Sequence, residues 1–104
     1  MEVEVTHFVD AGERDADGTY DYYYEGDNYT FRGDGQTLVV RTYVDAPAAA
    51  YFLGISHSMV RESRLAEQAA HYFTSTGRNT FFCVGPSGGY EAWTPRGSLG
   101  GVDE

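Results

Sequence analysis

Residues 20–44 read YDYYYEGDNYTFRGDGQTLVVRTYV, in which three runs rich in aromatic and β-branched residues are separated by Gly26-Asp27 and Asp34-Gly35. Asp-Gly is the strongest short-range signal for a two-residue hairpin, because a type I′ turn needs positive φ at both central positions. Gly26-Asp27, with glycine first, matches a type II′ turn. This stretch therefore predicts a three-stranded antiparallel meander over residues 20–44.

The two predicted turns give a single register for the meander. Side chains alternate between the two faces of a strand. The face predicted to enter the core carries Tyr20, Tyr22, Tyr24, Tyr29, Phe31, Leu38 and Val40. The opposite face is predicted to carry Asp21, Tyr23, Glu25, Thr30, Arg32, Val39, Arg41 and Tyr43. A one-residue slip would exchange the two sets, so the hydrophobic pattern supports the register strongly.

Further strands are predicted on both sides of the meander. Val3, Val5 and Val9 alternate with polar residues, which indicates an N-terminal strand with its valines towards the core. Pro47 interrupts the sheet, and the apolar run that follows it predicts a strand at 50–55. A short helix capped by Asp45, with Pro47 in its first turn, is the alternative for residues 46–55. Residues 79–84 and 90–93 flank a glycine-rich loop and predict a closing hairpin.

One amphipathic helix is predicted at about 58–76. Its apolar residues recur on one side at helical spacing, and Gly77 provides the expected C-terminal stop. The predicted fold is therefore α+β, an antiparallel sheet with this helix packed on one face. Residues 1–95 form one domain, and residues 96–104 form a flexible glycine-rich tail.

Composition restricts the classes of partner. The formal net charge is −9, and all seven basic residues are arginines. This balance argues against direct nucleic-acid binding, which needs a clustered basic surface. A GC-rich genome or adaptation to salt would account for the missing lysines, and the alternative is an acidic surface that meets a basic protein. A single cysteine and the lack of any long apolar run favour a cytoplasmic protein without a membrane span.

The sequence contains no recognisable catalytic constellation or cofactor motif. His7, His57 and His71 lack the spacing of metal ligands, and Cys83 lies in an apolar run where a thiol behaves as a small hydrophobe. His57 and Ser58 precede the predicted helix and could hold an anion or a ligand carboxylate. A serine N-cap preceded by a surface histidine is the alternative interpretation. We therefore expect no metal and no cofactor, and we lean against an enzyme.

The predicted outer face of the meander is the main candidate site. Tyrosine and arginine are enriched where protein surfaces lose water on binding, which points to Tyr23, Arg32, Arg41 and Tyr43. A solvated sheet face is the alternative. The favoured function is a non-catalytic module that binds a basic protein, for example an immunity or inhibitor protein. The other hypotheses are a ligand-binding protein or enzyme with a tyrosine-lined pocket between sheet and helix, and a homodimer through the outer face.

Overall fold

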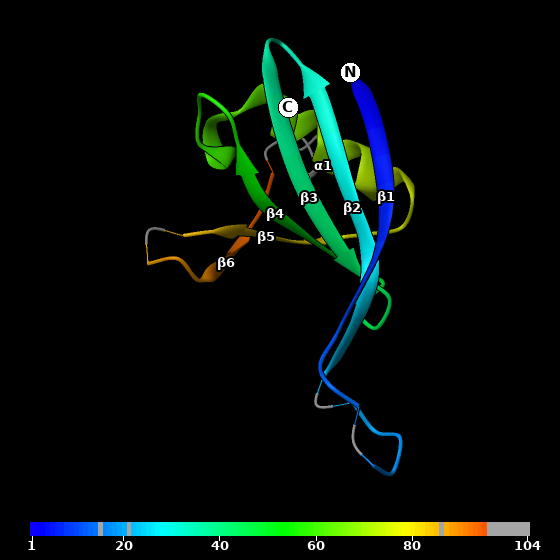
Figure 1. Ribbon diagram of the computed structural model, residues 1–104. Helices are drawn as coiled ribbons and strands as arrows, with labels where there is room; N and C mark the ends of the chain where they lie inside the picture. Colours follow the sequence, from blue (N-terminus) through cyan, green and yellow to red (C-terminus); the bar gives the residue numbers. More distant parts are fainter. Residues whose placement is uncertain (15, 21, 86, 96–104) are drawn as a thin grey trace.

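Six strands and one α-helix make up the computed structural model, which describes residues 1–14, 16–20, 22–85 and 87–95. The elements are β1 (Glu2–Ala11), β2 (Tyr23–Gly33), β3 (Gln36–Tyr43), β4 (Ala49–Ile55), the 3-10 helix η1 (Val60–Glu62), α1 (Arg64–Ser75), β5 (Thr80–Val84) and β6 (Tyr90–Trp93). The strands form one sheet in chain order, with α1 on one face (Figure 1). The predicted α+β architecture is confirmed, whereas the predicted tail at 96–104 lies outside the described residues.

The hairpin between β2 and β3 has the predicted turn and register. Asp34 and Gly35 have φ values of 53° and 73°, as a type I′ turn requires. Phe31 pairs with Leu38, and both side chains are completely buried, whereas Arg32 is exposed. The Asp-Gly signal therefore assigned the faces of this hairpin correctly.

The predicted turn at Gly26-Asp27 is wrong. β2 runs straight through both residues, which pair with β1 on one side and with β3 on the other. The third strand of the meander is therefore β1 and not residues 20–25. Because the chain does not reverse here, Tyr24 stands on the face opposite Phe31. Tyr22 and Tyr24 are both exposed, contrary to their predicted place in the core. Tyr20 is exposed as well.

β1 confirms the predicted N-terminal strand, but its valines do not enter the core. Val3, Val5 and Val9 are all exposed, and no β1 residue belongs to the buried core of the described chain. β1 lies at one edge of the sheet, where it pairs only with β2. Alternation correctly indicated a strand, but it could not show how far the covering helix extends.

The segment from β4 to β5 forms a β-α-β unit. β4 confirms the predicted strand, and β5 runs parallel to it, because α1 carries the chain back along the sheet between them. The β4–β5 pair is therefore parallel, whereas the sheet was predicted to be antiparallel. α1 begins at Arg64 and not near residue 58, because residues 60–62 form η1 and Ser63 is the N-cap. The Ser63 hydroxyl oxygen accepts a hydrogen bond from the Ala66 amide at 3.2 Å.

The core fills the space between α1 and the sheet. Ala66, Ala69 and Ala70 are completely buried and let the helix approach the sheet closely. Phe73 packs edge-to-face against Phe31, with ring centroids 5.5 Å apart. The other buried apolar residues of this cluster are Leu38, Val40, Ala50, Phe52, Leu65, Phe81, Cys83 and Trp93.

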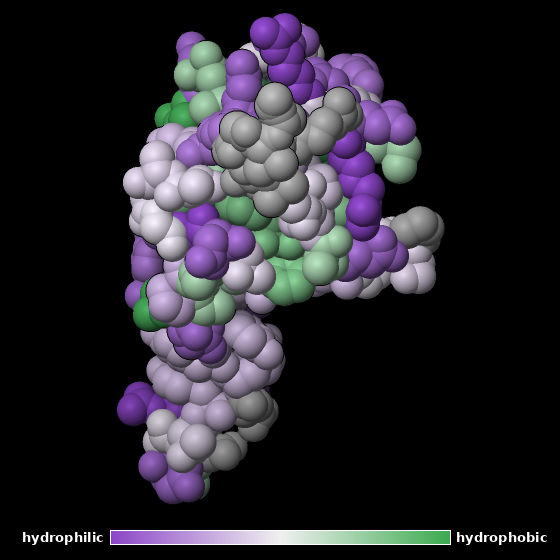
Figure 2. Space-filling model, turned by 180° about the vertical axis from the view of Figure 1, so that it is seen from behind, coloured by the Kyte–Doolittle hydropathy of each residue, from purple (hydrophilic) through white to green (hydrophobic). Residues whose placement is uncertain are grey.

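β1 and β2 extend beyond the other strands as a projecting two-stranded arm (Figure 1). The molecule measures 58 × 28 × 27 Å along its principal axes, and the arm accounts for much of that elongation. Near its end, the Gly12 amide donates to the Tyr22 carbonyl at 2.9 Å, and Arg14 pairs with Tyr20. From behind, the arm is coloured hydrophilic to neutral, whereas hydrophobic surface gathers on the body (Figure 2).

Candidate functional site

The sheet face opposite α1 carries a group of aromatic side chains. Residues that pair directly across a ladder share a face. Through β2, the register aligns Phe8 of β1 with Tyr43 of β3, and it aligns Arg41 of β3 with Tyr51 of β4 and Phe82 of β5. We call the following six residues the outer-face aromatic cluster: Phe8, Tyr24, Tyr43, Tyr51, Phe82 and Tyr90.

Ring contacts connect the whole cluster. The centroid of Tyr43 lies 5.9 Å from that of Phe8, 6.0 Å from that of Tyr24 and 5.4 Å from that of Tyr51. Tyr51 stacks on Phe82 at 5.1 Å with an interplanar angle of 13°. Such contacts contribute about 0.5–1.5 kcal/mol each beyond burial, so the cluster orders itself without a covering layer.

Gly26 makes room for the contact between Phe8 and Tyr43. It stands between them in β2, paired with Phe8 on one side and Tyr43 on the other. A Cβ atom at position 26 would collide with the backbone carbonyl of Thr42. Glycine inside a strand often marks a close backbone approach, and here it also allows two rings to meet above the backbone.

The cluster remains accessible to solvent. Tyr24 and Tyr90 keep 49% and 47% of their surface exposed, and the other four members are half-buried. Partial burial raises the pKa of Tyr90, and the neighbouring Tyr43 raises it further, so the phenol is a neutral hydrogen-bond donor at neutral pH. Contiguous exposed apolar surface rimmed by polar groups is typical of interaction sites.

Charged groups on this face are mostly acidic. Asp10 pairs with Tyr24 across the ladder and so shares its face. Asp45 follows the end of β3 and lines a shallow pocket of about 440 Å³ together with Tyr24, Tyr43, Ala46 and Tyr51. Arg41 is held within the face, because its Nε donates to the Asn28 side-chain oxygen at 2.9 Å.

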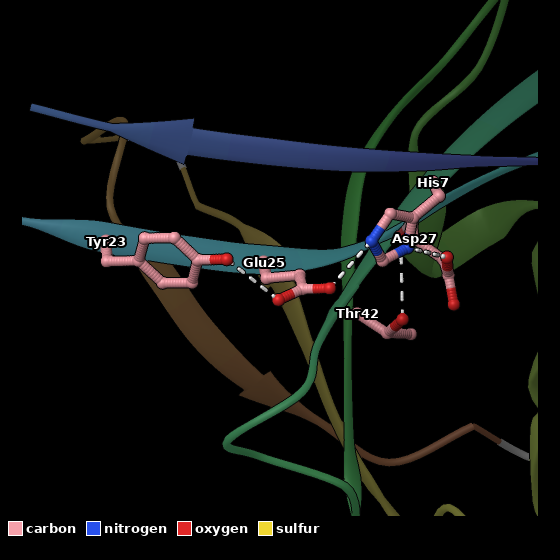
Figure 3. Close-up of polar contacts among 5 residues, drawn as sticks. All are labelled: His7, Tyr23, Glu25, Asp27 and Thr42. Atoms are coloured by element: carbon pink, nitrogen blue, oxygen red, sulfur yellow. Dashed lines mark hydrogen bonds and ion pairs between the residues drawn. The ribbon is translucent and has the colours of Figure 1, made fainter.

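At the base of the arm, the sheet face opposite the aromatic cluster carries a chain of polar side chains (Figure 3). His7 lies between two carboxylates of β2: its Nδ1 is 3.0 Å from Asp27 Oδ1 and its Nε2 is 2.8 Å from Glu25 Oε2. Both nitrogens face acceptors, so both carry a proton in the favoured form. Asp27 first and Glu25 second raise the pKa of His7. The Tyr23 hydroxyl donates to Glu25 at 3.0 Å, and this carboxylate raises the pKa of Tyr23.

This polar chain acts as a clamp between β1 and β2. A general base needs a free lone pair, whereas both ring nitrogens of His7 are engaged by carboxylates. Thr42, buried beside the chain, donates to the Asp27 backbone carbonyl at 3.5 Å and ties β3 to it. The geometry therefore indicates strand cross-linking and not proton transfer to a substrate.

The structure brings together two of the four residues predicted for the binding face. Arg41 and Tyr43 lie in or beside the outer-face aromatic cluster. Tyr23 stands on the opposite face of the arm, because β2 does not turn at Gly26 and its alternation is therefore inverted relative to the prediction. Arg32 lies near the other end of β2 and pairs with Glu4 at 3.1 Å.

His57 and Ser58 lie in a turn well before α1. His57 has a φ of 62°, and the Ser58 hydroxyl donates to the Met59 carbonyl. Neither residue reaches the helix N-terminus that the prediction assigned to them, because Ser63 caps that end. Ser58 instead lines a mainly apolar pocket of about 500 Å³ with Leu53, Gly54, Ile55, Met59, Val60, Arg61, Cys83, Val84, Gly85 and Glu91.

The interface between sheet and helix is packed with apolar side chains. Phe31, Phe52 and Phe73 meet there with no exposed surface. In the part of the chain that the structure describes, every buried side-chain nitrogen and oxygen has a hydrogen-bond partner. A tyrosine-lined pocket lies instead on the outer face.

Sequence reasoning missed Phe8, Tyr51, Phe82 and Tyr90 as members of the site, and it placed Tyr24 in the core instead. Their positions depend on which strands are neighbours, and strand order is not visible in local patterns. Gly26 was the available signal, since a glycine can also mark a close backbone approach inside a strand. Interpreting it as part of a turn hid the pairing of β1 with β2.

No family model, curated protein or solved structure matches this chain. Within the described residues, no group of three or more His, Cys, Asp or Glu side chains is arranged to hold a metal ion. The described helices include none that is long and apolar enough to span a membrane.

Proposed function

We propose that the protein is a non-catalytic binding module that docks on a basic protein through the outer-face aromatic cluster. The observation that carries this proposal is the connected, solvent-accessible aromatic surface on the sheet face that α1 leaves uncovered. Tyrosine is one of the residue types that dominate protein interfaces. An inhibitor or immunity protein directed against a basic toxin or nuclease is one concrete instance.

The charge of the chain favours a basic partner. With a net charge of −9, the molecule attracts a positively charged protein and accelerates its association. The same charge disfavours a nucleic acid, and it disfavours a second copy because Asp10 and Asp45 of both copies would approach one another. The buried free thiol of Cys83 fits a reducing compartment, so we place the protein in the cytoplasm.

The polar groups give less support to an enzyme. Cys83 is 1% exposed and belongs to the core, and both nitrogens of His7 contact carboxylates. The apolar pocket lined by Ser58 presents few polar groups apart from Arg61 and Glu91, which pair with each other at 2.8 Å. Binding therefore explains the exposed aromatic surface better than catalysis does.

A paired-variant capture experiment tests this proposal. Tyr24→Ser/Tyr90→Ser removes two exposed members of the cluster, and Tyr20→Ser/Tyr23→Ser removes two similarly exposed tyrosines of the arm outside it. We expect the wild type and the arm variant to capture the same basic protein, identified by mass spectrometry, and the cluster variant to lose it. With the purified pair, the association rate should fall as salt is added.

Three results would contradict the proposal. The first is a cluster variant that captures the partner as well as the wild type does. The second is a captured partner that is acidic or is a nucleic acid. The third is a concentration-dependent dimer in sedimentation equilibrium that Tyr24→Ser/Tyr90→Ser dissociates, because a second copy would then occupy the face.

A further inference from the structure

The shallow pocket on the outer face combines three tyrosine rings with one carboxylate. Tyr24, Tyr43 and Tyr51 line it together with Asp45 and Ala46. Tyr43 meets its two neighbours at steep angles, 62° with Tyr24 and 74° with Tyr51, so the rings do not form a single flat stack. The pocket thus offers aromatic surface in more than one orientation beside an acid.

Backbone hydrogen bonds hold the acidic side of the pocket in place. The Val44 amide donates to the Glu25 carbonyl at 2.8 Å, and the Ala46 amide donates to the Tyr43 carbonyl at 3.1 Å. These bonds form a tight turn directly after β3 and keep Asp45 beside Tyr43. The site is therefore largely formed before any partner arrives, which lowers the entropic cost of binding.

The carboxylate of Asp45 has no hydrogen-bond or ion-pair partner among the described residues. The two arginines of the outer face are engaged elsewhere, Arg41 with Asn28 and Arg32 with Glu4. Aromatic faces carry negative potential, so a cation placed between the rings and Asp45 would interact favourably with both. The chemistry of the pocket is complementary to a cation that the described chain does not supply.

The same molecule already shows how a guanidinium group binds such rings. The Arg41 guanidinium carbon lies 4.7 Å from the centroid of Phe8 on this face, and that of Arg14 lies 5.8 Å from the Tyr20 centroid. A planar guanidinium can stack on a ring and also offer two parallel N–H groups to a carboxylate, whereas an ammonium cannot. These contacts favour arginine over lysine.

We propose that this pocket receives an arginine side chain of the docking protein, with the guanidinium against the tyrosine rings and its N–H groups donating to Asp45. The assignment rests on the proposed function. Tyr24 is half exposed and Asp45 is exposed, so the pocket is too open to enclose a free small molecule. A side chain carried by a protein that covers the surrounding cluster would be enclosed.

An NMR titration with short peptides tests the pocket directly. The probe is a capped five-residue peptide with one arginine among glycines, compared with its lysine and citrulline counterparts at low salt. We expect a saturable upfield shift of the arginine δ-methylene protons, which ring currents produce only above an aromatic face. The lysine peptide should bind more weakly, and the citrulline peptide should not bind measurably.

Matched variants show whether peptide binding depends on this pocket or only on the negative charge of the protein. Asp45→Asn and Tyr24→Leu should each weaken arginine-peptide binding about two- to fivefold, as expected for one exposed cation–π or charged contact. Asp34→Asn removes the same charge at the distant β2–β3 turn, and Tyr20→Leu removes an exposed tyrosine outside the pocket. Both controls should bind like the wild type.

The outcomes distinguish this assignment from the proposed function. If Asp45→Asn and Tyr24→Leu bind the arginine peptide as tightly as the wild type, or if all three peptides bind equally, the pocket assignment is overturned. The proposed function then still stands provided that Tyr24→Ser/Tyr90→Ser loses the captured partner. If that variant still captures the partner, the proposed docking function is overturned, and the assignment of the pocket to an arginine of the partner is overturned as well.

Discussion

The two faces of the sheet are similarly rich in aromatic residues but differ in what covers them. On the inner face, Phe31 and Phe52 are completely buried against α1, whose Phe73 is completely buried as well. On the outer face, four of the six members of the cluster are tyrosines, and two of these are about half exposed. Inner-face tyrosines such as Tyr29 are only partly buried. Tyrosine is therefore more common on the uncovered face, because a phenol tolerates water at its hydroxyl.

The largest expected difference between the faces is in stability. Phe31→Ala should lower the free energy of unfolding by about 3–5 kcal/mol, because it opens a cavity in the layer beneath α1. Tyr90→Ala, on the outer face, should cost under about 1 kcal/mol. Urea denaturation of both variants measures the contrast. Equal losses would mean that the outer face contributes to folding as much as the core does.

Gly26→Ala tests the close approach that assembles the outer face. The new Cβ would run into the Thr42 carbonyl, so β2 and β3 must separate locally, at a cost of about 1–3 kcal/mol. Gly54→Ala is the matched control, because a Cβ there meets nothing within 4 Å. We expect the midpoint of urea unfolding of this control to equal that of the wild type. A Gly26→Ala protein as stable as this control would show that no close approach exists.

Gly35→Val tests the turn that assigns side chains to the two faces. Gly35 has a φ of 73°, and a β-branched residue held there should cost roughly 1–2 kcal/mol. Asp34→Asn should be tolerated, since Asn-Gly suits the same turn. Thermal unfolding measures both variants. An unchanged melting temperature for Gly35→Val would point to a longer loop.

The smallest expected effect concerns His7, which lies at the base of the arm and is exposed. His7 has a raised pKa when folded, so its contribution to stability is complete below its usual value of 6.5 and is lost as pH rises through the folded value. The stability advantage of the wild type over His7→Gln should therefore be largest below pH 6.5 and shrink as the pH rises above that value.

The order of the two carboxylates around His7 is also testable. Asp27→Asn should lower the pKa of His7 more than Glu25→Gln does, because Asp27 is the larger cause of the increase. An NMR titration of the imidazole protons measures both variants. A wild-type pKa at or below 6.5 would contradict the clamp.

Local chemistry explains which parts of the fold were predictable. The Asp34-Gly35 turn depends on two adjacent residues, and the 3.6-residue period of α1 depends on one segment. The pairing of β1 with β2 depends instead on residues about 20 positions apart, such as His7 and Asp27. No turn signal specifies such a contact, so the role of Gly26 was misassigned.

The same distinction applies to the candidate site. Arg41 and Tyr43 lie in the strand whose register the turn determines, and sequence reasoning identified both. Tyr51 and Phe82 join the site only because β4 and β5 run parallel with α1 between them. That arrangement comes from packing of the helix on the sheet, which cannot be inferred from a local pattern of residues along the chain.

Strand order in this sheet also bears on how the chain folds. Every strand lies beside its neighbour in the sequence, so most pairings require only short loops to close. The two-residue turn between β2 and β3 closes the shortest loop, and such hairpins form in about 1–10 μs. Closure between β4 and β5 must wait for η1 and α1, which lie between them. We therefore expect φ-values to be high at Leu38 and low at Trp93, and the reverse pattern would contradict this order. Phe82 and Tyr90 of the outer-face aromatic cluster lie in β5 and β6. The cluster would therefore be completed last, after the rings of β2 and β3 are already in place.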